Sequence, residues 1–387
     1  MKIAVASLGD PRSVKTWSGT PSHIIAALEK RGHEVAGISV RKPVEPWHFD
    51  WQRRIHMRLQ KKWFLSSVDK IVLEDIGKQI DQEVEKINPD IVLVIHGDFL
   101  AYCTFKQPAI IVHDTTFASL VGYYPEFSNL SQRSIRAGND MYQRALNKAS
   151  AAVFSAGWAS QSATKDYRVD PNKIFTIPFG ANLREVPADT DVENWITKRS
   201  QATTCSFLFL GVRWERKGGP DALRFVKALH QMGISSQLVV VGCSPEVDKE
   251  DEVYVQQLGF LRKDVPQEKQ QLESLFQTCQ ALLVPSVAEC YGCVFCEANA
   301  YGLPVLARET GGIPEIVKDG LNGLLLGPHE TPEELARRWA KIYTDKDGYQ
   351  QMSHKARAEY KTRLNYQVFV ERLEAIALPL VEAPVEI

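Results

Sequence analysis

Short apolar segments alternate with amphipathic segments along most of the chain, and this alternation restricts the fold more than any other feature of the sequence. Each apolar segment is bounded by turn-forming residues, as in a strand that is buried on both faces. Residues 22–32, by contrast, place Ile24, Ile25 and Leu28 at helical spacing before Gly32. Alternating strands and helices are typical of parallel α/β sheets. The predicted strands are residues 2–7, 91–97, 109–114, 151–156, 206–211, 237–242, 281–286 and 304–308.

The alternation runs twice, with an aperiodic stretch between the two runs. Residues 178–193 contain two prolines, a glycine and a run of charges. A chain of 387 residues is also longer than one ordinary hydrophobic core requires. We therefore predict an α/β protein with two doubly wound domains, residues 1–180 and 181–365, and a C-terminal segment, 366–387, that packs back toward the first domain. Such folds bind ligands at the carboxyl ends of their strands, so a crevice between the domains is the expected binding place.

Composition argues against several classes of protein. The formal net charge of −1 provides no basic field for a nucleic acid. Seven cysteines, an odd and scattered set, fit a reducing compartment better than a disulfide framework. The first residues, "MKIAVASLGDPRS", have no apolar run long enough for a signal peptide, and no later stretch is long enough to span a bilayer. We expect a cytoplasmic protein.

Residues 211–229 combine a basic loop with the start of a helix. Arg213, Arg216 and Lys217 follow the strand that ends at Gly211, and a helix is predicted from Gly219-Pro220. Backbone N–H groups at a helix start, beside Arg and Lys, form an anion site suited to phosphate. The alternative is a charged surface loop.

The window "AECYGCVFCEANAYG" (288–302) can be interpreted as a metal site. Cys290, Cys293 and Cys296 stand three apart, as in iron–sulfur and zinc proteins. A ferredoxin-type run requires a fourth cysteine at position 300, which is Ala300, and no further Cys or His is close in sequence to complete a zinc site. Cysteine also packs as a small hydrophobic residue. We expect no bound metal here.

The same window can instead be interpreted as a carboxylate and anion site. Gly292 permits a tight turn into a helix that is predicted from about residue 293. The N–H groups near Cys293 and Val294 would then point out of the helix start, and Glu297 would lie just over one turn into it. Glu289 would remain in the preceding loop. Carboxylates in these places can accept hydrogen bonds from ligand hydroxyls.

Two loops of the first domain also follow predicted strands. Gly19 lies in the loop before the helix at 22–32, and His113 and Asp114 end the strand at 109–114. Proton transfer, or contact with a sugar, would suit this edge of a sheet. The alternative for His113 is a hydrogen-bonded histidine at a strand end. Gly311 and Gly312 permit a similar close approach of backbone to ligand in the second domain.

Together these stretches resemble the retaining glycosyltransferases of the GT-B fold, in the large family four group. The family's E-x7-E signature is similar to Glu289–Glu297. The resemblance continues through "YGLPVLARETGGIPEIVKDGLNGLLL", "RWERKGGPDAL", "SGTPSHIIAALEKRGHEV" and "VFSAGWASQSATKDYRVDPNKIFTIPFGANL". It covers the chain from the first strand to about residue 345. A lone E-x7-E motif would be weak, whereas these blocks in this order are specific.

The resemblance implies a role for each matching residue. Glu297 would hold the ribose hydroxyls of a nucleotide-sugar, and Glu289 would face the sugar at the reacting centre. Arg216 and Lys217 would neutralise the diphosphate. The remaining implied contacts with the donor come from Gly19, Tyr291, Gly292, Cys293, Val294 and Arg213, and from Phe260 and Leu261 in the base-pocket segment 258–263. His113 or Asp114 would contact the sugar in the first domain.

The family resemblance also implies the reaction. A hexosyl group would pass from a UDP- or GDP-type sugar to a sugar or lipid-linked sugar with retention of configuration, without a metal or other cofactor. Val212 stands where many members carry an arginine, so Arg213 and Arg216 both remain candidates for the diphosphate contact. Cys290 stands where glycine is common. The alternatives are a nucleotide-sugar epimerase of the same fold and a binding protein without turnover.

The segment "RRIHMRLQKKWF" (53–64) is basic and amphipathic. It contains five Arg and Lys residues and no acid, together with Ile55, Leu59, Trp63 and Phe64. As a helix it could contact an anionic membrane surface. The commoner explanation of such a pattern is a solvated basic helix. The sequence does not determine the acceptor or the oligomeric state.

Overall fold

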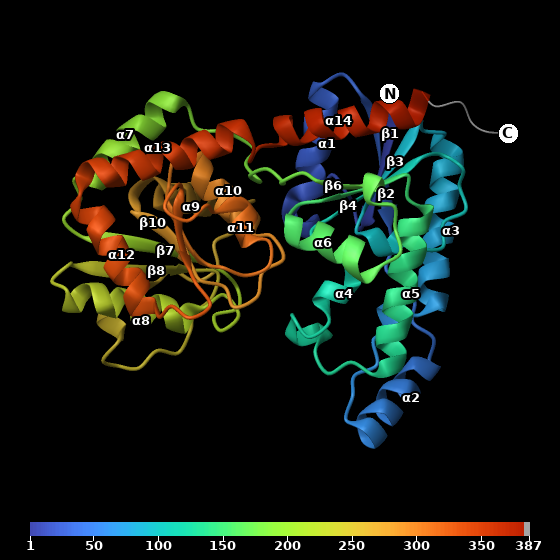
Figure 1. Cartoon of the computed structure of the whole chain (residues 1–387), viewed down its shortest axis with the longest axis horizontal. Helices are drawn as coiled ribbons and strands as arrows, with labels where there is room; N and C mark the ends of the chain where they lie inside the picture. The colour runs from blue at the N-terminus through green and yellow to red at the C-terminus, as the bar shows by residue number, and fades with distance from the viewer. Residues whose placement is uncertain (383–387) are drawn as a thin grey trace. The chain divides into compact units, whose positions relative to one another are not determined.

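Two parallel β-sheets organise the computed structural model, which describes residues 1–382 (Figure 1). Each sheet has six strands in this described part of the chain. One compact unit contains residues 1–179 and the C-terminal helix α14 (Tyr366–Glu382). The other contains Gly180–Asn365. The predicted architecture of two doubly wound parallel sheets is confirmed.

In the first unit the strand order is β2-β1-β3-β4-β5-β6. The chain therefore reverses its direction across the sheet between β1 and β3, and the loops after these neighbouring strands start at the same edge. The strands are β1 (Lys2–Leu8), β2 (Glu34–Val40), β3 (Ile91–Ile95), β4 (Ala109–His113), β5 (Ala151–Phe154) and β6 (Ile174–Thr176). The helices are α1 (Thr20–Lys30), α2 (His48–Ile55), α3 (Lys70–Ile87), α4 (Phe117–Leu120), α5 (Gln132–Lys148), α6 (Gly157–Asp166) and α14.

In the second unit the strand order is β12-β11-β10-β7-β8-β9, and the reversal lies between β7 and β10. The strands are β7 (Cys205–Leu210), β8 (Ser236–Val241), β9 (Val255–Gln257), β10 (Ala281–Val284), β11 (Val305–Arg308) and β12 (Gly323–Leu326). The helices are α7 (Asp189–Ser200), α8 (Gly219–Gln231), α9 (Pro266–Thr278), α10 (Cys293–Ala300), α11 (Ile313–Ile316), α12 (Pro332–Thr344) and α13 (Lys346–Thr362).

Central strands are buried on both faces, which is why their sequences are continuously apolar. Every residue of β3, β4, β5 and β10 is buried. All eight strands predicted from the sequence coincide with observed strands to within a few residues. The prediction missed β2, β6, β9 and β12. Of these, β2 alternates between buried and exposed residues as an outer strand, and β6 and β9 are three-residue outer strands that are largely half-buried or exposed.

The basic segment 53–64 is only partly helical. Helix α2 ends at Ile55, a π-helical turn spans His56–Gln60, and the chain then leaves the helix. Phe64 is buried, whereas Ile55, Leu59 and Trp63 are exposed. Within residues 1–382, no helix has both the length and the apolar character needed to cross a membrane.

Candidate functional site

The second unit brings two of the predicted loops together at the point where its strand order reverses. Strands β7 and β10 are hydrogen-bonded neighbours, with Ala281 opposite Phe207 and Leu282 opposite Leu208. The chain leaves β7 toward α8 through residues 211–218, and it leaves β10 toward α10 through residues 285–292. Ligands of doubly wound sheets bind at this kind of position.

Main-chain contacts fix the two loops against each other. The N–H of Val287 donates to the carbonyl oxygen of Arg216 at 2.8 Å, and Nη1 of Arg216 donates to the carbonyl oxygen of Ala288 at 2.8 Å. Gly218 adopts a positive φ of 76°, and a Cβ atom there would lie 2.1 Å from the carbonyl oxygen of Pro285. The approach is therefore possible only with glycine at position 218.

Glu289 lies within a cluster of cations in this part of the unit. Glu289 is only 8% exposed, and its carboxylate forms an ion pair with Nζ of Lys217. Nη1 of Arg216 lies 3.6 Å from Oε2 of Glu289, and Oγ of Ser286 donates to the same oxygen at 3.3 Å. The structure thus joins Glu289, Arg216 and Lys217, three residues that the sequence placed in one site.

Glu297 lies in the second turn of α10, as predicted, and is 4% exposed. Nζ of Lys263 lies 2.9 Å from its Oε1 and 3.0 Å from its Oε2. The Lys263 side chain is 49% exposed, so one partner of this ion pair reaches solvent while the other is buried. The sequence analysis gave Lys263 no role of its own. Lys263 could have been identified from its position at the end of the predicted base-pocket segment, 258–263.

Both helices at this site begin after a glycine. Gly292, with a φ of 94°, precedes α10, and Gly218 precedes α8, so neither helix start is capped by a side chain of that residue. The backbone around Cys293 and Val294 forms the first turn of α10. Because a helix N-terminus carries partial positive charge, the two helix starts add to the charge of Arg216 and Lys217.

The cysteines of this window pack among other side chains. Cys290 and Cys296 are buried, and Cys293 is half-buried. Sγ of Cys296 lies 3.5 Å from the hydroxyl oxygen of the buried Tyr291, and burial raises the pKa of Cys296 well above its usual value. Within residues 1–382 there is no group of three or more His, Cys, Asp or Glu side chains arranged to hold a metal ion.

Other predicted donor contacts lie closer to solvent. Arg213 is exposed, Phe260 is 66% exposed and Leu261 is half-buried. Of the two candidate arginines, Arg216 is the one that forms an ion pair with Glu289, beside the closer pair of Glu289 with Lys217.

In the first unit, the loop before α1 has an unusual backbone. Gly19 precedes α1 with a φ of 88°, and Trp17 and Ser18 also have positive φ values, of 42° and 57°. The Trp17 ring meets the His96 ring edge-on, with their centroids 4.6 Å apart. Non-glycine residues with positive φ are uncommon and cost backbone strain, which makes this loop a candidate functional segment. The sequence analysis selected Gly19 but not Trp17.

His113, at the end of β4, is buried and engaged through one ring nitrogen. Its Nδ1 lies 3.2 Å from the hydroxyl oxygen of Tyr142 and 3.4 Å from the backbone nitrogen of Gly97. Its Nε2 lies 3.8 Å from Oδ1 of Asp114, which is too far for a hydrogen bond. Burial, and then the neighbouring His96, lower the pKa of His113 well below its ordinary value. The imidazole is therefore neutral at neutral pH.

His96 and Asp98, in the loop that follows β3, extend this polar cluster, and the sequence analysis missed both. The His96 and His113 rings stack with centroids 5.0 Å apart, and His96 has a positive φ of 75°. Oδ1 of Asp98 is buried and has no hydrogen-bond partner among the described residues. Burial lowers the pKa of His96 and raises that of Asp98. The sequence feature that could have identified them is the run "HGD" directly after a buried strand.

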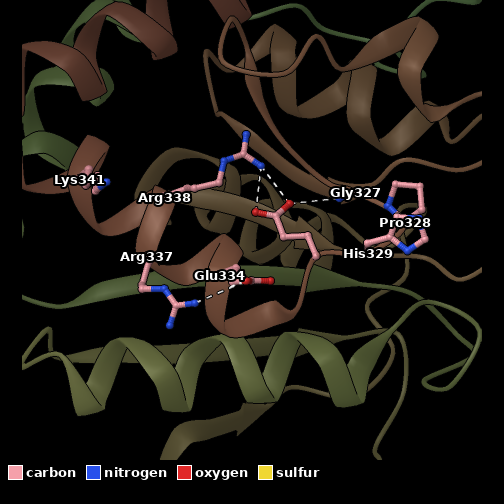
Figure 2. Close-up of a pocket in the computed structure, with 8 residues that line it drawn as sticks. Gly327, Pro328, His329, Glu334, Arg337, Arg338 and Lys341 are labelled. Carbon is pink, nitrogen blue, oxygen red and sulfur yellow. Dashed lines mark hydrogen bonds and ion pairs between the residues drawn. The ribbon is translucent and has the colours of Figure 1, made fainter.

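A separate hollow, of about 680 Å³, lies beside the end of β12 (Figure 2). Arg338 donates to Glu330, and its Nη2 donates to both carboxylate oxygens of Asp319. Arg337 lies 3.8 Å from Glu334, as Figure 2 shows. Glu334 also completes a capping box at the start of α12. These charges stabilise the β12–α12 connection, and the hollow lies at an outer strand rather than at the β7/β10 reversal.

Comparison with known proteins assigns the fold. Sucrose-phosphate synthase from Thermosynechococcus elongatus superimposes with a TM-score of 0.68 at 19% identity, over 98% of this chain and 97% of that one. HepE from Anabaena, solved in complex with UDP, gives a TM-score of 0.64 at 20% identity, over 97% of this chain and 100% of that one. The chain has the GT-B glycosyltransferase fold.

The matching family model lies within the second GT-B unit. Residues 196–359 match the family model described as glycosyl transferases group 1. D-inositol 3-phosphate glycosyltransferase from Xylanimonas cellulosilytica is 30% identical over 192 residues. That alignment covers 46% of this chain and 45% of the relative, so the match spans less than half of the relative's length. The matched family region contains Glu289, Glu297, Arg216, Lys217 and Lys263.

Proposed function

We propose that this GT-B chain is a retaining glycosyltransferase that takes a hexosyl group from a nucleoside-diphosphate sugar. One observation carries the proposal. A buried E-x7-E pair, two cationic side chains and two glycine-preceded helix starts lie together where the strand order of the second unit reverses. This combination suits a ligand that has hydroxyl groups at one end and a diphosphate next to them.

In the proposed donor complex, Glu297 accepts hydrogen bonds from the ribose hydroxyls. Its carboxylate is already desolvated, and Lys263 occupies both of its oxygens in the free protein. The ribose must therefore displace Lys263 or share the carboxylate with it. A uridine nucleotide is the first choice of donor, since the related fold of HepE was solved with UDP. A guanosine nucleotide remains the second choice.

The proposed chemistry is stabilisation of the departing diphosphate. Breaking the bond between the anomeric carbon and the diphosphate leaves negative charge on the phosphate oxygens and positive character on the sugar. Lys217, Arg216 and the starts of α8 and α10 would stabilise that negative charge without a bound metal. Glu289, their ionic partner in the free protein, would remain beside the electron-poor sugar carbon. With no separate nucleophile proposed, the acceptor hydroxyl would attack the anomeric carbon on the face from which the diphosphate departs, and an oxygen of the departing phosphate would take up the hydroxyl proton.

The first unit would contribute to sugar recognition. His113 is neutral at neutral pH, so it can exchange hydrogen bonds with sugar hydroxyls without adding charge. Asp114 lies beside it, and Gly19 would permit the 14–19 loop to approach a phosphate. We propose a sugar or a lipid-linked sugar as the acceptor. Inositol phosphate deserves testing too, because a curated relative is named for that acceptor.

A donor screen followed by a turnover assay tests this proposal. Thermal unfolding should be measured with uridine, guanosine and adenosine diphosphate sugars, because a ligand that binds the folded state raises its melting temperature. The best donor is then incubated with and without sugar, inositol phosphate and lipid-linked acceptors. Consumption of the donor that requires an acceptor supports a transferase. Conversion of the donor alone indicates an epimerase, and tight binding without any reaction indicates a binding protein; either result would overturn the proposal.

A further inference from the structure

A row of large apolar side chains along α2 and its two flanks, from Trp47 before the helix to Leu59 in the π-helical turn after it, is exposed to solvent. Trp47 is 78% exposed, Trp51 61%, Ile55 46% and Leu59 77%. They are spaced four residues apart, so they follow one side of the helix. In an α-helix this spacing drifts by roughly 40° per step, and the wider π-helical turn at His56–Gln60 offsets part of the drift. We call this row the tryptophan face; α2 itself lies at the far end of the first unit (Figure 1).

The opposite side of α2 anchors the helix to the first unit. Phe49 is buried and packs edge-on against Phe64, and the His56 ring stacks on Phe64 with centroids 5.7 Å apart. Arg53 forms an ion pair with Glu45 and donates to Oγ of Ser66 at 2.8 Å. Because the inner side already fills the contact with the protein, the tryptophan face is left to solvent.

Cations lie next to the tryptophan face without acidic partners. Arg54, Arg58, Lys61 and Lys62 are all exposed, and none of them forms an ion pair in the part of the chain that the structure describes. On a helix, Arg54 and Arg58 fall beside Trp51, Ile55 and Leu59. Residues 51–65 contain no Asp or Glu. The surface therefore combines exposed aromatic and aliphatic groups with a local excess of positive charge.

We propose that the tryptophan face and its four cations dock this chain on the surface of an anionic lipid bilayer. Tryptophan and aliphatic side chains enter the boundary between lipid headgroups and acyl chains, while Arg and Lys contact anionic headgroups. A solvated basic helix accounts for the four cations but leaves Trp47, Trp51 and Leu59 unexplained. A symmetric contact with a second copy would bring like charges together, because each copy presents the same patch to the other.

This docking does not require the proposed transferase activity. A bilayer site on the first unit can bind whether or not the second unit turns over a donor. The inference deepens the proposed function in one respect: docking would place a lipid-linked acceptor on the same surface as the enzyme, and that step rests on the transferase proposal. Vesicle binding measured without donor or acceptor separates the two proposals.

The test is co-sedimentation of the full chain with vesicles. Phosphatidylcholine vesicles with and without phosphatidylglycerol should be compared at low and high salt. We expect the partition coefficient to rise at least about tenfold with the anionic lipid and to fall again at high salt. The triple variant Trp47→Ser, Trp51→Ser, Leu59→Ser and the quadruple variant Arg54→Gln, Arg58→Gln, Lys61→Gln, Lys62→Gln should each lose most of this binding.

A charge-matched control distinguishes vesicle binding through the tryptophan face and its cations from binding that depends only on the net charge of the chain. The control variant removes four exposed cations elsewhere in the first unit: Lys30→Gln, Lys78→Gln, Lys106→Gln, Lys165→Gln. It should bind anionic vesicles like the unaltered chain. Equal binding to both vesicle types, or an equal loss in the control variant, overturns the inference. So does concentration-dependent dimerisation that only the tryptophan variant abolishes. Circular dichroism of each variant verifies that it is folded.

Discussion

Lys263 holds both carboxylate oxygens of Glu297, with Nζ at 2.9 Å from one and 3.0 Å from the other. Lys263 lies in the segment between β9 and α9 and Glu297 lies in α10, 34 positions apart in sequence. Glu297 is buried and Lys263 is half-exposed, so only the lysine end of this ion pair reaches solvent. A ligand that uses Glu297 must compete with this ion pair.

Replacing Lys263 should therefore separate stability from donor binding. Lys263→Met leaves the buried Glu297 carboxylate without this counter-ion, which should lower the free energy of unfolding by about 1–2 kcal/mol, less than for a fully buried pair because the lysine reaches solvent. The rise in melting temperature on adding the nucleotide should become larger than in the unaltered chain, since the ribose hydroxyls would then meet an unoccupied carboxylate. Thermal unfolding with and without UDP measures both effects.

Lys269→Met provides the control for this change. Lys269 belongs to the same unit and pairs with Glu185 and Glu273 near the surface. Its replacement should change the free energy of unfolding by no more than about 0.5 kcal/mol and should leave the nucleotide-induced rise in melting temperature as in the unaltered chain. If Lys263→Met reduces the nucleotide-induced shift instead, Lys263 binds the nucleotide directly and the competition model is wrong.

Lys217 should affect turnover more than donor binding. Charge on the leaving diphosphate increases in the transition state, so Lys217→Met should lower kcat by about 10²–10³-fold and change KM for the donor far less. Steady-state kinetics with the donor selected by thermal shift measures both constants. Lys198→Met, on the exposed side of α7, should behave like the unaltered chain. An unchanged kcat in Lys217→Met would remove the lysine from the proposed mechanism.

Two glycines with nearly the same φ allow the steric effect of the close approach between the loops to be separated from backbone strain. A Cβ atom at Gly218 (φ 76°) would lie 2.1 Å from the Pro285 carbonyl oxygen, whereas Gly233 (φ 79°) has no atom within 4 Å of that position. Gly233→Ala should cost about 1 kcal/mol through backbone strain alone. Gly218→Ala should cost at least about 2 kcal/mol more and weaken the donor-induced shift in melting temperature. Equal destabilisation of the two variants would show that the loops can separate without penalty.

The fold was largely predictable because its signals are local. Continuous apolar runs mark central strands whatever their neighbours, which is why β3, β4 and β10 were found from the sequence. Outer strands such as β2 and β9 bury only part of their surface, so their sequences look like loops or alternating segments. Their membership of the sheet depends on the adjacent strand, which sequence periodicity does not reveal.

The residues of the candidate site that belong to a sequence motif were predictable, whereas those that reach the site only through tertiary contacts were not. Glu289 and Glu297 were found from their spacing, and the joining of Glu289 with Lys217 followed from the two loops being at strand ends. The pairing of Lys263 with Glu297 depends on how the 258–263 segment returns to α10, which no local pattern encodes. Likewise, the contact of Trp17 with His96 joins loops far apart in sequence.

The buried imidazole of His113 should make the stability of the chain depend on pH. Burial lowers its pKa in the folded state, while an unfolded histidine titrates near about 6.5. Below that pH the unfolded chain binds a proton that the folded chain does not, so the contribution is fully present above pH 6.5 and is lost as the pH falls. The loss amounts to about 1.4 kcal/mol per pH unit for one proton.

Urea unfolding at several pH values between 8 and 5 tests this dependence. His113→Asn retains a polar atom near the position of Nδ1 and cannot titrate. Its free energy of unfolding should therefore fall less steeply below pH 6.5 than that of the unaltered chain. The difference between the two slopes should be at most the slope that one bound proton produces. Carboxylates that titrate in the same range cancel in the difference between the variant and the unaltered chain. His329→Asn, at an exposed position, serves as the control and should keep the original slope. Parallel slopes for His113→Asn and the unaltered chain would mean that His113 takes up its proton in the folded state, because the cluster around Tyr142 and His96 opens to water.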